Sequence, residues 1–170
     1  NPIRSVLVTG CGADEGVGEL AANLAAAFGR SGRKVLLVDV DATGEATGLL
    51  GLDKLAPSAT PGVRSSIRSL PTRFRSSFTP SFEVAPQGTV TIGDTKEFAH
   101  VEELLARAAE SYEMIVVASA PALDSSTTLT WARAADGSIL AAMREHSKRD
   151  RVSDSVESLR LVDSNLIGTV

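Results

Sequence analysis

Short apolar runs alternate with segments of helical periodicity along the chain. Residues 6–9 are apolar and β-branched and lead into a glycine-rich stretch, residues 10–18, which predicts a buried strand followed by a loop. Apolar side chains then recur at helical spacing over residues 20–28, where alanine, the strongest helix former, is frequent. Residues 35–38 predict a second buried strand. This strand–loop–helix–strand order is typical of a βαβ unit, so we expect a parallel sheet.

The same two patterns continue to the end of the chain. Residues 114–118 are almost continuously apolar, which is typical of a central strand buried on both faces of a sheet. Further predicted strands cover residues 82–86, 138–142 and 166–170, and further predicted helices cover residues 100–111, 129–135 and 152–161. The pattern predicts one doubly wound α/β domain over residues 1–170, with a mainly parallel sheet. Because the last strand stops abruptly at Val170, we expect the chain to be part of a longer protein.

The middle of the chain is basic and less regular. Residues 54–82 hold five basic residues, no acidic residue, four prolines and seven serines. We interpret this segment as surface loops around one short helix at residues 63–70. Its simplest role is a solvated loop, and the alternative is a basic patch that meets an acidic partner or an anionic membrane surface. The arginines of this candidate interaction patch are Arg64, Arg68, Arg73 and Arg75.

Composition narrows the possible functions. The chain has 170 residues, one cysteine, two histidines and a formal net charge of −4. A chain of this length buries a core without a disulfide, and we interpret the single Cys11 as a small buried thiol, although a nearby helix start can lower a thiol pKa. The acidic balance argues against nucleic-acid binding, and so few histidines and cysteines argue against a transition-metal site. The longest apolar stretch, residues 114–123, is about half of the ~20 residues of a membrane-spanning helix, so we expect none.

The segment between the first strand and the first helix, residues 10–18, is called the glycine loop below. Backbone N–H groups converge in such a loop and the helix dipole favours negative charge, so it is a typical phosphate-binding element. Its glycines are Gly10, Gly12, Gly16 and Gly18. Together with later segments, the loop resembles the P-loop ATPases of the bacterial tyrosine-kinase (BY-kinase) and MinD/ParA type. The matching segments, in order, are residues 8–18, 21–25, 35–41, 85–88, 112–121 and 135–140. The resemblance implies the P-loop NTPase fold.

Three positions depart from the active members of that family. Active members carry a lysine and then a serine or threonine where this chain has Val17 and Gly18, which are followed by Glu19. The lysine offsets the charge of a triphosphate, and the hydroxyl binds Mg²⁺. Ala118 replaces the strand aspartate that helps to hold the metal. At ~1.5–3 kcal/mol for each charge-assisted hydrogen bond, the three losses total about 4–9 kcal/mol, against about −8 kcal/mol for a micromolar complex. We therefore expect a degenerate loop that binds neither ATP nor Mg²⁺.

Two acidic residues remain where the family uses acids at the metal and the reacting water. Asp39 and Asp41 end the second predicted strand. Without the other ligands, we interpret them as structural acids at a strand end beside a helix N-terminus.

The resemblance also implies a cellular setting. It implies a catalytically inactive tyrosine-kinase-like or ATPase-like domain that acts as an interaction or regulatory module, with cell-surface polysaccharide synthesis or export as the leading process. Its implied partner is a protein, through a membrane-associated assembly or self-association. The implied location is cytoplasmic, at the inner face of the membrane through a linked or partner membrane protein.

Three alternatives stay open at this point. A weakly active ATPase with an atypical loop is one of them, although the oxidoreductase that follows is the leading alternative. A short-chain-dehydrogenase-like oxidoreductase is the second, since Asp39 is suitably placed for a ribose hydroxyl, but the spacing of five residues between Gly10 and Gly16 is two too many. Tyr112 also lacks the lysine that this class needs four residues later. A hydrolase is the third and weakest, because no nucleophile-elbow motif supports its candidate residues. Those residues are Ser119, Asp124, Ser125, Ser126 and His146.

Overall fold

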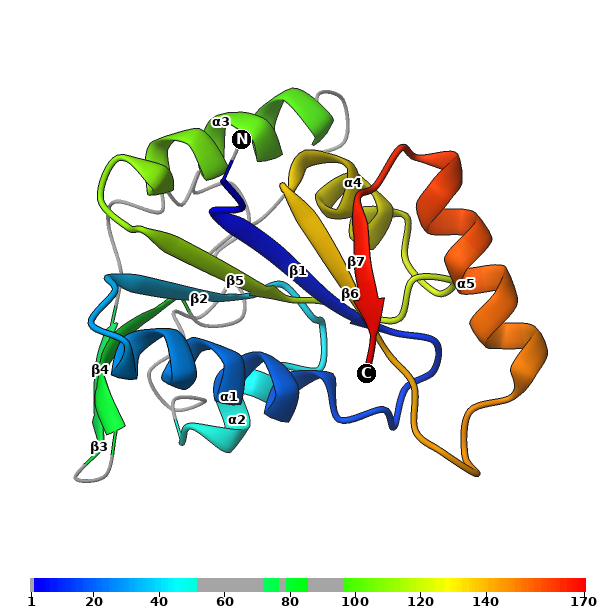
Figure 1. Ribbon diagram of the computed structural model, residues 1–170, viewed down its shortest axis with the longest axis horizontal. Helices are drawn as coiled ribbons and strands as arrows, with labels where there is room; N and C mark the ends of the chain where they lie inside the picture. The colour runs from blue at the N-terminus through cyan, green and yellow to red at the C-terminus, as the bar shows by residue number, and fades with distance from the viewer. Residues whose placement is uncertain (1, 52–71, 77–78, 86–96) are drawn as a thin grey trace.

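The protein is an α/β domain built on a seven-stranded sheet with helices on both faces (Figure 1). This computed structural model describes residues 2–51, 72–76, 79–85 and 97–170. The strands are β1 (Ser5–Gly10), β2 (Val35–Asp39), β3 (Thr72–Ser76), β4 (Thr79–Ala85), β5 (Met114–Ala118), β6 (Gly137–Ala141) and β7 (Leu166–Thr169). The helices are α1 (Val17–Arg30), α2 (Glu45–Leu49), α3 (Glu97–Ala109), α4 (Ser126–Ala134) and α5 (Arg149–Leu161).

The sheet has the order β3-β4-β2-β5-β1-β6-β7. Every neighbouring pair from β4 to β7 is parallel, and β3 alone runs antiparallel, as an edge strand beside β4. The prediction of a mainly parallel, doubly wound sheet is therefore confirmed. Figure 1 shows β1 and β5 at the centre, where the apolar runs of the sequence are longest.

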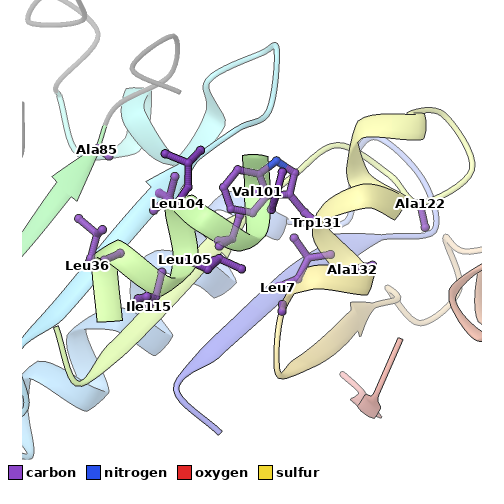
Figure 2. Close-up of a cluster of buried hydrophobic side chains, with 14 of the residues drawn as sticks. Leu7, Leu36, Ala85, Val101, Leu104, Leu105, Ile115, Ala122, Trp131 and Ala132 are labelled. Carbon is purple, nitrogen blue, oxygen red and sulfur yellow. The ribbon is translucent and has the colours of Figure 1, made fainter. Parts of the chain in front are cut away.

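Alternate side chains of the central strands enter two separate cores. Leu7 and Ile115 belong to a cluster under α3, α4 and α5, while Val8 and Val116 belong to a cluster under α1. In the first cluster, α3 and α4 pack together with Trp131 of α4 beside the α3 side chains (Figure 2). Strands buried on both faces need apolar residues at every position, which explains the unbroken apolar runs.

The strand order adds a detail that the sequence pattern did not specify. The β1–α1–β2 unit is present in a parallel sheet as expected, and β5 lies between β1 and β2 and pairs with both. In the dinucleotide-binding fold the first two strands are direct neighbours. The strand order therefore removes the structural support for the oxidoreductase alternative.

The structure differs from the sequence-based expectations at several smaller elements. The expected loops of residues 54–82 include β3 and the start of β4, so Arg73 and Arg75 lie on a strand. The expected helix at residues 63–70 lies outside the described residues. Helix α2 was not predicted, because its five residues are too short for a periodic signal. Among the helices that the structure describes, none is both long and apolar enough to cross a bilayer.

The side chains of the central strands β1 and β5 are buried. Leu7 has no exposed surface, whereas Leu161 is 78% exposed on α5. We expect Leu7→Ala to lower the free energy of unfolding by about 2–5 kcal/mol, because it leaves a cavity in the core. Leu161→Ala is the control and should change it by less than about 0.5 kcal/mol. Denaturant unfolding measures both, and equal effects would contradict this assignment of the core.

Candidate functional site

The carboxyl ends of β1, β2 and β5 meet at one edge of the sheet. The glycine loop leaves β1 at Gly10, β2 ends at Asp39, and β5 ends at Ala118. Ala118 is in register with Asp39 on one side and with Val8 on the other. The topology therefore brings together the glycine loop, the acidic strand end and Ala118, which are far apart in sequence.

Helix α1 begins at the end of the glycine loop. Gly16 adopts a left-handed conformation with φ 65°, which favours glycine, and no side chain caps the helix there. Val17, which the resemblance predicts at the position of the family lysine, is 6% exposed and packs in the core between α1 and the sheet. Glu19 is exposed in the first turn of the helix. The described residues of this helix start thus present an acidic side chain and no cationic one.

Gly18 makes the contact between α1 and α2. Its backbone N–H donates to a carboxylate oxygen of Glu45 over 2.9 Å. A Cβ atom on Gly18 would lie 2.7 Å from the backbone nitrogen of Ala46 and 2.8 Å from Cγ of Glu45. The start of α2 therefore fills the space that a serine or threonine side chain would need at this position.

Asp39 is buried at the end of β2 and binds Thr47 in the first turn of α2. Its carboxylate accepts hydrogen bonds from Thr47 N–H at 2.7 Å, from Thr47 Oγ1 at 2.6 Å and from Asp41 N–H at 3.2 Å. Burial raises the pKa of Asp39 above its ordinary value of 3.8, and the hydrogen bonds oppose this only in part. Asp41 accepts from both the N–H and the hydroxyl of Thr43. Both acids thus bond to the chain that follows β2.

Side-chain hydroxyls donate to main-chain carbonyls on both sides of Ala118. Its neighbour Ser119 directs its hydroxyl to main-chain carbonyl oxygens. The carbonyl of Ala120 accepts from the hydroxyls of Thr9, at 2.8 Å, and Thr128, at 3.0 Å. These contacts tie the end of β1 to the β5–α4 connection.

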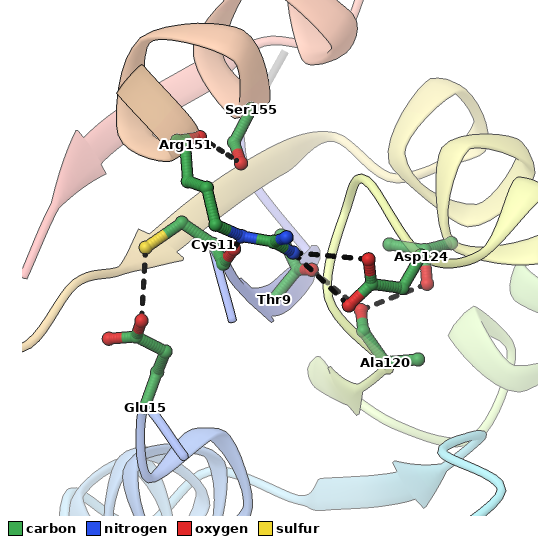
Figure 3. A network of polar contacts seen from close by, with 8 residues as sticks. Thr9, Cys11, Glu15, Ala120, Asp124, Arg151 and Ser155 are labelled. Atoms are coloured by element: carbon green, nitrogen blue, oxygen red, sulfur yellow. Dashed lines mark hydrogen bonds and ion pairs between the residues drawn. The ribbon is translucent and has the colours of Figure 1, made fainter. Parts of the chain in front are cut away.

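Besides Glu45, which binds Gly18, the buried carboxylate of Glu15 also fixes the glycine loop (Figure 3). Glu15 is 8% exposed and accepts hydrogen bonds from Cys11 Sγ at 3.1 Å, Met143 N–H at 2.7 Å and Ser147 Oγ at 2.6 Å. Burial by itself raises the pKa of Glu15, but these hydrogen bonds and the charge of His146 outweigh it, so the pKa lies below its ordinary value of 4.5. Burial raises the pKa of Cys11, in agreement with a small buried thiol.

Arg151 of α5 joins the glycine loop to the β5–α4 connection (Figure 3). Its Nε–H donates to the carbonyl of Cys11 over 2.8 Å, and its Nη2 pairs with Asp124 at 3.1 Å. The two side chains of this ion pair are 42% and 50% exposed, so the pair itself adds about 1 kcal/mol or less. Arg151 therefore acts mainly by fixing the backbone of the loop.

The structure places only some of the remaining candidate residues. Arg64 and Arg68 lie outside the described residues, and Arg73 and Arg75 lie on β3, which β4 and β2 separate from β5. Three residues of the hydrolase alternative make structural contacts at or near this edge. Asp124 pairs with Arg151, Ser125 caps α4 by accepting from Thr128 N–H, and Ser119 bonds to carbonyls.

The parts of the site that sequence reasoning missed are the contacts of Glu15 and Glu45. Both are acidic residues in or after a polar loop, and no periodicity or motif distinguishes them from solvated acids. The position of Glu15 directly before Gly16 does not by itself indicate a buried carboxylate. Their partners come from elements far away in the chain, at Met143 and Gly18 respectively.

Known proteins resemble the chain in both sequence and fold. The tyrosine-protein kinase YwqD of Bacillus subtilis is 24% identical over 170 residues, which cover 99% of this chain and 71% of YwqD. The chromosome-partitioning ATPase Soj of Thermus thermophilus is 31% identical over 155 residues, which cover 89% of this chain and 60% of Soj. The kinase domain of Escherichia coli tyrosine kinase ETK superposes with a TM-score of 0.78 at 20% identity, over 98% of this chain and 66% of that domain. No protein-family model matches the chain.

The sheet order, the loop between β1 and α1 and these similarities define a P-loop NTPase fold. The homologues and structural neighbours of the chain are bacterial tyrosine kinases and MinD/ParA-like P-loop ATPases. The chain spans only part of the length of these relatives, 71% of YwqD and 60% of Soj.

The buried network of Glu15 has a pH dependence of defined sign. Glu15→Gln should lower the free energy of unfolding by about 1–3 kcal/mol at pH 7, because buried donors lose a charged acceptor. The folded-state pKa is below 4.5, so the stabilisation is complete above that pH and is lost as the pH falls through the folded-state pKa. Urea unfolding of both proteins between pH 7 and pH 3 measures the difference, and a constant difference would contradict the assignment.

For Asp39→Asn we expect stability relative to the wild type to change with pH in the direction opposite to that of Glu15→Gln. The pKa of Asp39 is raised above 3.8, so its contribution to stability is greatest when it is protonated and decreases as the pH rises through the folded-state pKa. The wild type should therefore lose stability relative to Asp39→Asn as the pH rises in this window. If the difference in the free energy of unfolding from the wild type changed with pH in the same direction for Glu15→Gln and Asp39→Asn, the pKa directions of Glu15 and Asp39 would be misassigned.

Proposed function

We propose that this domain is a catalytically inactive relative of the P-loop kinases and ATPases and acts as an interaction or regulatory module. The proposal rests on the burial of Val17, which is 6% exposed and packs in the core. The resemblance to the family places the phosphate-binding lysine at this position. A triphosphate concentrates negative charge that backbone dipoles offset only in part. A buried valine supplies no compensating charge.

The groups that would organise Mg²⁺ also fit poorly. Gly18 has no hydroxyl, and the start of α2 leaves no space for one. Ala118 has no carboxylate, and the carboxylate of Asp39 is already bonded to Thr47 and Asp41. Mg²⁺ requires near-octahedral oxygen ligands and usually takes one or two carboxylates together with phosphate oxygens. We therefore derive no catalytic step through ATP or Mg²⁺.

Nearby charge supports the same conclusion. Glu45 places a carboxylate on Gly18 N–H, and Glu19 lies in the same turn of α1. A phosphate group at this helix start would meet two like charges, which raises the free energy of the complex. An atypical, weakly active ATPase is the second candidate, favoured by the kinase and ATPase activities that the names of the relatives state.

The partner in this proposal is a protein. Bacterial tyrosine kinases are among the relatives, and we extend the proposal to a membrane-associated assembly or self-association, with cell-surface polysaccharide synthesis or export as the process. Arg73 and Arg75 lie on the edge strand β3, which supports a contact through that edge. Arg64 and Arg68 complete the proposed patch in the sequence.

Nucleotide binding tests the first part of the proposal. We expect no thermal shift and no calorimetric heat with ATP, ADP or GTP, each with Mg²⁺, or with NAD⁺ or NADP⁺, up to millimolar concentrations. A ligand at about 100 times its Kd would add about 2.7 kcal/mol of stability, so a micromolar site is readily detected. The Thermus thermophilus ATPase serves as the positive control. Stabilisation by ATP that requires Mg²⁺ would contradict the proposal and favour the weakly active ATPase.

Substitutions in the basic patch test the second part of the proposal, the contact with a protein partner or a second copy of the chain. Replacing Arg64, Arg68, Arg73 and Arg75 with glutamine should weaken assembly about fourfold to several hundredfold, because surface ion pairs at ~0.2–1 kcal/mol each add up over four sites. Sedimentation velocity over a concentration series measures this. The control replaces four exposed cations elsewhere, with the same change in net charge: Arg144, Lys148, Arg149 and Arg160. Unchanged assembly after loss of the patch, or equal loss in the control, would contradict the patch.

A further inference from the structure

One charged hydrogen bond connects α2 to the first turn of α1. Glu45 is the first residue of α2, and its carboxylate accepts from the N–H of Gly18 over 2.9 Å across a sequence separation of 27 residues. The first N–H groups of a helix have no partner within the helix and need an acceptor from elsewhere. In α1, where Gly16 provides no side-chain cap, the chain itself supplies that acceptor.

A second set of bonds fixes α2 from the sheet. Thr47, two residues after Glu45, donates both its N–H and its hydroxyl to Asp39 at the end of β2. Thr47 is 2% exposed and Asp39 is 1% exposed, so these bonds are shielded from water. Helix α2 is thus held between α1 and β2 by two carboxylates, and it needs no external group for this position.

Gly18 is required by space rather than by backbone conformation. Its φ is not in the positive range, so other residues can adopt the same backbone angles. In a helix, alanine is ordinarily more stable than glycine. A Cβ here would nevertheless lie 2.7 Å from the backbone nitrogen of Ala46, closer than such atoms approach. Glycine therefore permits the close contact that brings Glu45 to the helix start.

We propose that Glu45 is an internal anion that latches α2 onto α1 and keeps the glycine loop closed without any ligand. This proposal rests on the proposed function, since a loop that binds no phosphate leaves Gly18 N–H available. An external phosphate arrives and leaves, but the Glu45 carboxylate is part of the chain. The surface formed by the glycine loop and α2 therefore stays in one arrangement, which suits an interaction module that nucleotide does not switch.

Amide hydrogen exchange of Glu45 variants tests the latch. In Glu45→Ala, exchange at Gly18 and at residues 44–49 should rise about tenfold or more, with a smaller rise in Glu45→Gln, whose amide oxygen still accepts a weaker bond. Glu19→Gln is the matched control, because Glu19 is an exposed acid in the same helical turn. Wild-type exchange in Glu45→Ala, or equal increases in Glu45→Ala and Glu19→Gln, would overturn the latch.

Gly18→Ala tests the same contact from the other helix. It should lower Tm by about 3–10 °C and speed exchange at residues 44–49, contrary to the ordinary gain from glycine to alanine in a helix. Gly48→Ala is the control, because a Cβ there meets nothing within 4 Å, and it should leave Tm unchanged or raise it. A Gly18→Ala protein as stable as the wild type would overturn the latch. Binding of MgATP by the wild type would instead contradict the proposed function, so the two failures are distinguishable.

Discussion

The pairing of β5 between β1 and β2 is the constraint on which the site depends. Parallel strands place all their carboxyl ends at one edge, so this pairing brings together the glycine loop, Asp39 and Ala118. The strands are held there by burial of both faces, which separates the interior into the two clusters on either side of the sheet. Every polar contact of the site is built on this apolar frame.

At that edge the protein uses its own carboxylates as anions. Glu15 holds the glycine loop to the β6–α5 connection, Glu45 holds the start of α1, and Asp39 holds α2. In a phosphate-binding loop, backbone donors remain free for a ligand. Here Gly18 N–H has an acceptor within the chain, and the neighbouring Val17 is buried. These contacts support the proposal of a site held together by the chain itself.

The sequence predicted the parts that depend on periodicity. Strand β5 and helix α1 follow from an unbroken apolar run and an apolar stripe. The assignment of Val17, Gly18 and Ala118 as altered nucleotide-site positions stays a prediction that rests on a resemblance to a known loop pattern. The insertion of β5 between β1 and β2 was missed, because strand pairing is non-local and apolar runs do not specify neighbours. Strand β3 was missed because it lies in a segment rich in proline, serine and arginine. The Glu45 contact has no sequence signal, since it depends on how α2 is folded against α1.

The most direct measurement is the ¹⁵N–¹H NMR signal of Gly18 during a titration with MgATP. The account predicts an amide that is already protected from exchange without nucleotide and whose chemical shift does not change at millimolar MgATP. An unprotected Gly18 amide that shifts and becomes protected as MgATP is added would contradict it. That result would show that the glycine loop is an open phosphate site rather than one closed by its own chain.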